Sequence, residues 1–117
     1  MRCGMLIKVT LGASLDLEFL KGFTIGEFPF EIQNNDCTAY DFTDSDGTFF
    51  AIYAKRNGKL LLTLEFEFAS PATNTVYLTA VQLTQIGALR AKEYWHVAYD
   101  VQDGEKVTLF QGITLVS

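Results

Sequence analysis

The chain has 117 residues, enough for one domain and too few for two separate cores. Nine basic against fourteen acidic residues give a formal net charge of -5 without any cluster of cations, which argues against a nucleic-acid-binding surface. The hydrophobic share of 49% is sufficient for a packed core, and one His with two widely separated Cys leaves little material for catalysis.

The N-terminal quarter contains two apolar, alternating stretches, residues 6–11 and 15–20, and residues 28–33 alternate in the same way. Each pattern predicts a β-strand. Residues 1–25 carry too much apolar surface for a free tail. Two hypotheses remain open for this segment: it forms the first strands of the domain, or part of it is an arm that adds a strand to a neighbouring subunit.

A β-hairpin is predicted in the middle of the chain, where residues 49–55 and 60–68 flank Asn57-Gly58. Asn-Gly favours a type I′ turn, in which both residues have positive φ. The second strand alternates between apolar and polar residues, so one continuous face is expected to carry Leu62, Leu64, Phe66 and Phe68.

One segment departs from the strand pattern. Thr79 and Gln82 have the spacing of a capping box, and Leu78 and Leu83 that of a hydrophobic staple, so a helical turn is predicted over residues 79–86. Gly87 is predicted to end this turn in the left-handed conformation.

The C-terminal third predicts two further strands around Asp103-Gly104, with the second continuing to Val116. Tyr94 opens the first strand just after a crossover, which is the position of a tyrosine corner in immunoglobulin-like sandwiches. On this strand Trp95, Val97 and Tyr99 share one face and are predicted to lie in the core together with Leu62, Leu64 and Phe66.

Seven or eight short strands with a turn every 8 to 12 residues or so are typical of a β-sandwich. We therefore predict that residues 1–117 form a single all-β, immunoglobulin-like sandwich with one short helical turn.

Few residues suggest a site. Asp41, Asp44 and Asp46 offer clustered oxygens to a cation, but the spacing of a full calcium loop is missing, so a polar connection is favoured over a metal. His96 has no second His to form a metal pair or a catalytic dyad, which favours a packed or surface role. No Ser-His-Asp order, phosphate loop or carboxylate pair appears, so no catalytic, cofactor or metal residue is assigned.

The aromatic residues leave alternatives open. Trp95 is interpreted as a core residue in preference to a sugar-stacking platform, and Phe23, Phe28 and Phe30 as core residues or as a partner surface.

The start of the chain lacks the apolar run of a secretory signal, and the uncharged residues 68–89 are too polar for a membrane span. We therefore expect synthesis in a reducing cytoplasm and free thiols at Cys3 and Cys37.

Several short motifs follow one another in the last three quarters of the chain. They are Tyr40-Asp41-Phe42-Thr43, the strand pair around Asn57-Gly58, Val76-Tyr77-Leu78-Thr79, the strand opened by Tyr94, Asp103-Gly104 and the closing residues 109–116. In this order they resemble the small β-sandwich virion proteins of tailed bacteriophages, found in tails, tail-fibre collars and necks.

This resemblance implies a non-enzymatic structural protein without cofactors, made in the bacterial cytoplasm and built into the virion as a homo-oligomeric ring or collar around the tail. Its expected partners are other tail or tail-fibre proteins, with no nucleic acid and no membrane. Two alternatives are a head or neck decoration protein, and a carbohydrate- or receptor-binding module that uses exposed aromatic residues such as Tyr40, Tyr77 and Tyr94.

Overall fold

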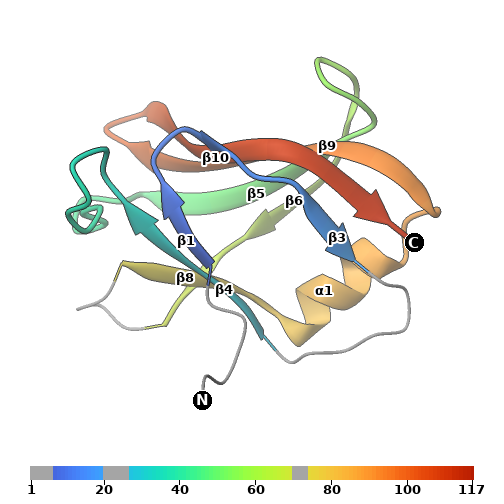
Figure 1. Cartoon of the computed structure of the whole chain (residues 1–117), viewed down its shortest axis with the longest axis horizontal. Coiled ribbons are helices and arrows are strands. Elements are labelled where there is room, and N and C mark those ends of the chain that lie inside the picture. Colours follow the sequence, from blue (N-terminus) through green and yellow to red (C-terminus); the bar gives the residue numbers. More distant parts are fainter. Residues whose placement is uncertain (1–6, 20–26, 70–73) are drawn as a thin grey trace.

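The computed structural model describes residues 7–19, 27–69 and 74–117 (Figure 1). Two β-sheets pack face to face, and one short helix lies at one end of them. The predicted fold class, an all-β sandwich with one short helical turn, is confirmed, but the described residues form ten strands and not seven or eight, since three of them have only two or three residues.

The larger sheet has the strand order β2-β10-β9-β5-β6, and β3 pairs with β10 beside β2. Its strands are β2 (Ala13–Ser14), β3 (Leu17–Phe19), β5 (Gly47–Tyr53), β6 (Leu60–Glu65), β9 (Lys92–Gln102) and β10 (Glu105–Val116). The smaller sheet has the order β1-β4-β8-β7. Its strands are β1 (Ile7–Thr10), β4 (Glu27–Gln33), β7 (Glu67–Phe68) and β8 (Thr75–Thr79), and helix α1 (Ala80–Gly87) follows β8.

The N-terminal segment belongs to the sandwich itself over residues 7–19. β1 runs parallel to β4, while β2 and β3 run parallel to β10. The chain changes sheets between two neighbouring residues: the Leu11 amide donates to Gln33 of the smaller sheet, and the Gly12 amide donates to Leu109 of the larger sheet. The hypothesis of intrinsic strands therefore holds for residues 7–19, and residues 1–6 and 20–26 lie outside the described residues.

A second crossing takes place at Phe66, on the opposite side of the sandwich. The Phe66 amide still donates to Thr48 of the larger sheet, and Glu67 already pairs with Tyr77 of the smaller sheet. The prediction of one continuous strand over residues 60–68 is therefore wrong in its last part. Leu64 and Phe66 are buried as expected and Leu62 is half-buried, but Phe68 is 40% exposed because the chain has turned at the crossing.

Both predicted hairpins form, with one difference in turn geometry. Asp103 and Gly104 have φ values of 53° and 79° and connect β9 to β10 as a two-residue turn. Between β5 and β6 only Asn57 has positive φ, because the turn is centred one residue earlier and closes with the Gly58 amide donating to Lys55. Glycine is needed at position 58 for space: a Cβ there would lie 2.7 Å from the Lys55 Cγ.

The capping box that begins α1 is confirmed. The Gln82 amide donates to the Thr79 hydroxyl over 3.2 Å, and the Thr79 amide donates to the Gln82 side chain over 2.9 Å. The prediction for Gly87 is wrong, since Gly87 is helical and the cap is Ala88 in a right-handed conformation, φ -77°. The Ala88 amide still bonds back to the carbonyls of the last turn, so this helix end needs no left-handed residue.

The tyrosine corner is also confirmed. Tyr94 is buried at the start of β9, and its hydroxyl donates to the Arg90 carbonyl over 2.8 Å. This bond holds the segment between α1 and the larger sheet.

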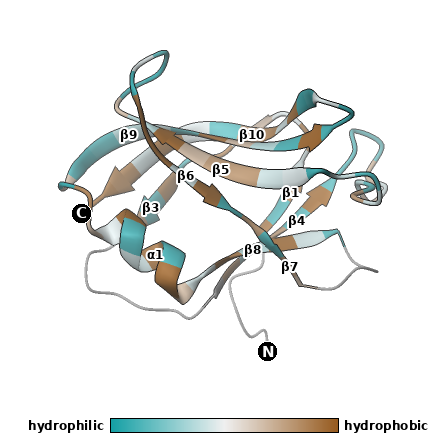
Figure 2. Cartoon of the chain, turned by 180° about the vertical axis from the view of Figure 1, so that it is seen from behind, coloured by the Kyte–Doolittle hydropathy of each residue, from teal (hydrophilic) through white to brown (hydrophobic). Residues whose placement is uncertain are grey.

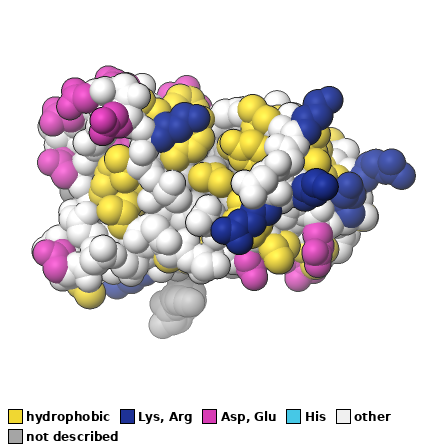
Figure 3. Space-filling model, turned by 90° about the horizontal axis from the view of Figure 1, so that it is seen from above, with side chains coloured by type: hydrophobic (Ala, Val, Ile, Leu, Met, Phe, Trp, Pro, Cys, Tyr) yellow, Lys and Arg dark blue, Asp and Glu magenta, His cyan; other side chains and the backbone are white. Residues whose placement is uncertain are grey.

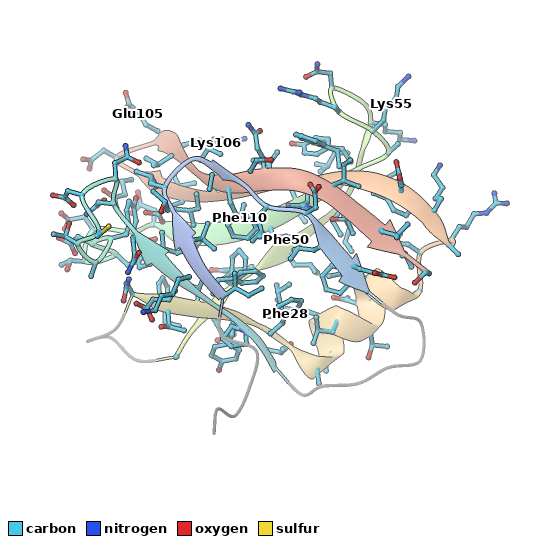
Figure 4. All side chains as sticks on the ribbon, in the orientation of Figure 1. Phe28, Phe50, Lys55, Glu105, Lys106 and Phe110 are labelled. Carbon is cyan, nitrogen blue, oxygen red and sulfur yellow. The ribbon has the colours of Figure 1, made fainter. Side chains whose placement is uncertain are left out.

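The core lies between the sheets and is rich in aromatic rings. Phe30 of the smaller sheet packs on Phe110 of the larger sheet with ring centroids 4.9 Å apart, and Phe50 and Phe66 complete the cluster. Phe50 and Phe110 are labelled between the two sheets in Figure 4. Phe28 and Phe30 are thus core residues and not a partner surface, while Phe23 lies outside the described part of the chain.

The predicted core face of β9 is wrong. Trp95, Val97 and Tyr99 are only half-buried and face outward, whereas the core face carries Tyr94, His96, Ala98 and Asp100. The sequence pattern misled because two of the inward residues are polar, and their hydrogen-bond partners come from other strands and from a distant loop.

Replacing Tyr94 by Phe is expected to lower the free energy of unfolding by about 1 kcal/mol, because the buried ring stays but the bond to Arg90 is lost. Tyr99→Phe, on the outward face of the same strand, should change it by less than about 0.5 kcal/mol. Urea denaturation of both variants checks this. Equal stability of Tyr94→Phe and the parent would show that the corner adds nothing.

Phe110 and Trp95 differ in burial, so their substitution is expected to have different effects on stability. Phe110→Ala should cost about 3–5 kcal/mol because it opens a cavity between the sheets. Trp95→Ala should cost roughly half of that or less, because its ring is half-exposed. Thermal denaturation of the two variants side by side measures the difference, and a larger loss for Trp95→Ala would contradict the assignment of the faces.

Candidate functional site

Asp100 is a fully buried carboxylate near the end of β9. Its oxygens accept hydrogen bonds from four side chains: Tyr40 at 2.8 Å, Ser45 at 2.5 Å, Thr48 at 3.0 Å and Gln102 at 2.9 Å. Burial, followed by the hydrogen bond to Asp100, raises the pKa of the Tyr40 hydroxyl, which keeps this hydroxyl a donor. With its oxygens engaged in this way, Asp100 anchors the loop between β4 and β5 and is not a free general base.

His96 is also fully buried, on the same face of β9 as Asp100 and four residues before it. Its Nδ1 shares a hydrogen bond of 2.6 Å with the Thr114 hydroxyl, and its ring stacks on Phe50 with centroids 5.1 Å apart. Nε2 has no hydrogen-bond partner. Burial lowers the pKa of His96 to about 4, although the Leu15 backbone and Asp16 oppose this shift. His96 is therefore a neutral, packed core residue, as favoured from the sequence.

The three aspartates considered for a metal lie on the exposed loop before β5. Asp41 accepts a hydrogen bond from the Thr43 amide over 2.8 Å, and the interactions with Thr43 lower its pKa. Within residues 7–19, 27–69 and 74–117, no three His, Cys, Asp or Glu side chains gather as they would around a metal ion. Cys37, on the same loop, is a free exposed thiol, and Cys3 lies outside the described residues.

The outward face of the larger sheet carries the residues that sequence reasoning missed. In the strand register Tyr53 lies opposite Trp95, which in turn lies opposite Ile113, and Phe49 lies opposite Tyr99. Phe49 and Tyr99 are in ring contact at 5.5 Å. Figure 3 looks onto this face and shows apolar side chains spread across it between charged groups. Several of its apolar side chains are open to solvent: Leu60 is 49%, Leu61 42% and Ile113 37% exposed.

Two cations lie over aromatic rings of this face. The Arg56 guanidinium is 5.0 Å from the centre of the Trp95 ring, and the Lys106 ammonium is 4.7 Å from that of Tyr99. Each pair is an exposed cation–π contact, worth about 0.5–1 kcal/mol. Both cations therefore lie against the outward face of the sheet.

Charge is divided between the two ends of the larger sheet. Gly47 pairs with Val101 at one end, and Tyr53 pairs with Trp95 at the other. At the first end, the acidic end, six exposed residues are acidic and one, Lys106, is basic; the acidic residues are Asp36, Asp41, Asp44, Asp46, Asp103 and Glu105. At the second, the basic end, five exposed residues are basic and one, Glu93, is acidic; the basic residues are Lys55, Arg56, Lys59, Arg90 and Lys92. Figure 3 shows most Lys and Arg side chains on its right half and an acidic group along its left edge.

The tyrosines proposed for a carbohydrate site do not form one surface. Tyr94 is in the core, and the half-buried Tyr40 is bound to Asp100. The aromatic residues that do share a surface are Phe49, Tyr53, Trp95 and Tyr99. The signal that could have found them is the pairing of β5 with β9, which places aromatic residues opposite one another, but a register is not visible in one strand alone.

No known family model matches the chain, and a search of curated proteins returns no significant match. In the described part of the chain, no helix has the length and hydrophobicity needed to cross a membrane.

The buried His96 makes stability depend on pH. Its pKa is 6.5 when unfolded and about 4 when folded, so the unfolded chain binds more protons between these values and stability falls as pH is lowered through this window. The expected loss from this residue is about 3 kcal/mol between pH 7 and pH 4. Denaturation of the parent and of His96→Gln across this range isolates the effect. Parallel pH profiles of the two proteins would contradict it.

Proposed function

We propose that this protein is a non-enzymatic structural component of a tailed-bacteriophage particle, forming a homo-oligomeric ring or collar around the tail to which fibres or other tail proteins attach. The observation that carries the proposal is the outward face of the larger sheet, where exposed apolar residues lie between a basic and an acidic end. Such a face suits contacts between proteins. The resemblance of residues 28–117 to small phage tail and collar proteins supplies the biological setting.

The buried ionisable groups support a structural role. Asp100 is surrounded by four donors that tie a loop to the sheet, and His96 is held neutral against Phe50. Each of these groups is explained by packing, so the function proposed here rests on surfaces. In this proposal the chain is made in the bacterial cytoplasm and is found afterwards in the virion.

A second candidate is a carbohydrate- or receptor-binding module. It is favoured by Tyr53 and Trp95, which lie opposite each other on the outward sheet face, since aromatic side chains on a sheet can stack against a sugar. Arg56 already lies over the Trp95 ring, so a sugar would have to displace it. A position as a head or neck decoration protein would use the same protein-contact surface.

If the proposal is right, the protein should be present in purified phage particles at a copy number that matches the symmetry of a ring. Quantitative mass spectrometry of particles, with labelling and electron microscopy to place the protein, makes the test. A glycan array serves as the comparison. Absence from particles together with glycan binding that is lost in Trp95→Ala would instead favour the second candidate.

A further inference from the structure

We propose that the basic end of one copy binds the acidic end of the next copy, so that identical chains associate head to tail. This inference rests on the proposed ring-forming function and deepens it by naming the two surfaces that meet. Each surface consists of exposed apolar residues rimmed by charge of one sign.

The basic surface lies at the β5–β6 hairpin. Leu60 and Leu61 are the two most exposed residues of the larger sheet's apolar set, at 49% and 42%, and follow directly after Lys59. Lys55 and Arg56 stand on the same hairpin, and Lys55 is labelled at this end in Figure 4. In Figure 2 hydrophobic residues run from the hairpin along β6. The result is an apolar patch bordered by cations.

The acidic surface lies where the loop before β5 meets β7. Phe68 is 40% exposed, and its ring lies 5.1 Å from that of the half-buried Phe42. The neighbouring Asp41, Asp44 and Glu67 are all exposed. This second apolar patch is therefore bordered by carboxylates, the complement of the basic surface.

The two surfaces lie at opposite ends of the molecule. β5 begins at Gly47, next to the acidic loop, and ends at Tyr53, just before the basic hairpin. Seven residues of strand separate them by about 20 Å. Because different surfaces meet, the contact is heterologous, and repeating it produces a ring when the rotation closes and a filament when it does not.

Both surfaces are held in place before binding. The acidic loop is anchored to Asp100 through Tyr40 and Ser45. The basic hairpin is closed by the Ala54 amide bonded to Lys59 and the Gly58 amide bonded to Lys55. Preorganised surfaces lose little conformational entropy on association, which favours binding.

The charges favour a second copy of this chain as the binding partner. The chain is acidic overall, yet five of the seven Lys and Arg in its described residues lie at the basic end, so an identical chain offers each end a surface of mainly opposite charge. Complementary charges steer the encounter and fix the orientation, and the effect weakens as salt screens it.

Charge reversal at each end tests the contact. One variant carries Lys55→Glu and Lys59→Glu, and the other carries Asp44→Lys and Asp46→Lys. These positions avoid Arg56, which lies over Trp95, and Asp41, which accepts the Thr43 bond. Lys8→Glu, on β1 away from both ends, is the matched control. Sedimentation velocity over a range of protein and salt concentrations reports assembly, and circular dichroism confirms that each variant is folded.

The parent and the Lys8→Glu control are expected to form species larger than a dimer, and to do so more weakly in high salt. Each reversed variant alone should associate at least about tenfold more weakly. An equimolar mixture of the two variants, or one chain carrying all four substitutions, should recover assembly because opposite charges meet again.

The inference is overturned by a parent that stays monomeric, by a parent that stops at a dimer, or by reversed variants that assemble like the parent. Particle analysis keeps it separate from the proposed function. A protein present in virions whose assembly ignores these charges contradicts the head-to-tail contact alone. A protein that assembles as described but is absent from virions contradicts the phage role alone.

Discussion

The buried carboxylate of Asp100 is the constraint on which much of this structure depends. A buried charge is costly unless hydrogen bonds replace its lost hydration. Here Tyr40, Ser45, Thr48 and Gln102 supply those bonds, and two of these donors belong to the loop that precedes β5. Satisfying one side chain of β9 therefore fixes a loop sixty residues earlier in the chain. That loop carries most of the acidic end, so its surface position is set from inside the fold.

The chain crosses from one sheet to the other at two places, one on each side of the sandwich. Near Gly12 the chain stops pairing with β4 and begins to pair with β10. At Phe66 it stops pairing with β5 and begins to pair with β8. Edge strands invite pairing with other chains. In this protein the chain that forms the edges of one sheet continues into the edges of the other. The edges of the two sheets are thus joined by continuous chain on both sides of the sandwich.

The outward face of the larger sheet unites the functional arguments. The pairing of β5, β9 and β10 places its aromatic residues opposite one another. Arg56 lies over the Trp95 ring and Lys106 over the Tyr99 ring. The division of charge comes from the residues of the connecting loops, since the loop before β5 carries Asp41, Asp44 and Asp46 and the β5–β6 hairpin carries Lys55, Arg56 and Lys59. The two ends of the sheet therefore differ in charge. A ring of identical subunits requires such a difference, because each subunit uses two different surfaces to contact its two neighbours.

The sequence by itself determined the local elements. Alternation located most strands, Asp103-Gly104 specified a two-residue hairpin, and Thr79 with Gln82 specified the start of α1. These features depend on interactions between neighbouring residues, so they can be recognised without knowing the fold. The Tyr94 corner could be predicted for the same reason, because its bond spans only four residues.

Tertiary structure alone decided which face of β9 is buried and where the chain changes sheets. The alternation predicts that the face of Trp95 lies in the core, yet the fold buries the opposite face, which carries His96. Thr114 and Phe50 accommodate His96, and distant donors accommodate Asp100, whereas the half-buried Trp95 faces outward with the Arg56 guanidinium over its ring. Polarity along one strand cannot reveal partners from another, because burial is decided by the free energy of the whole packed arrangement.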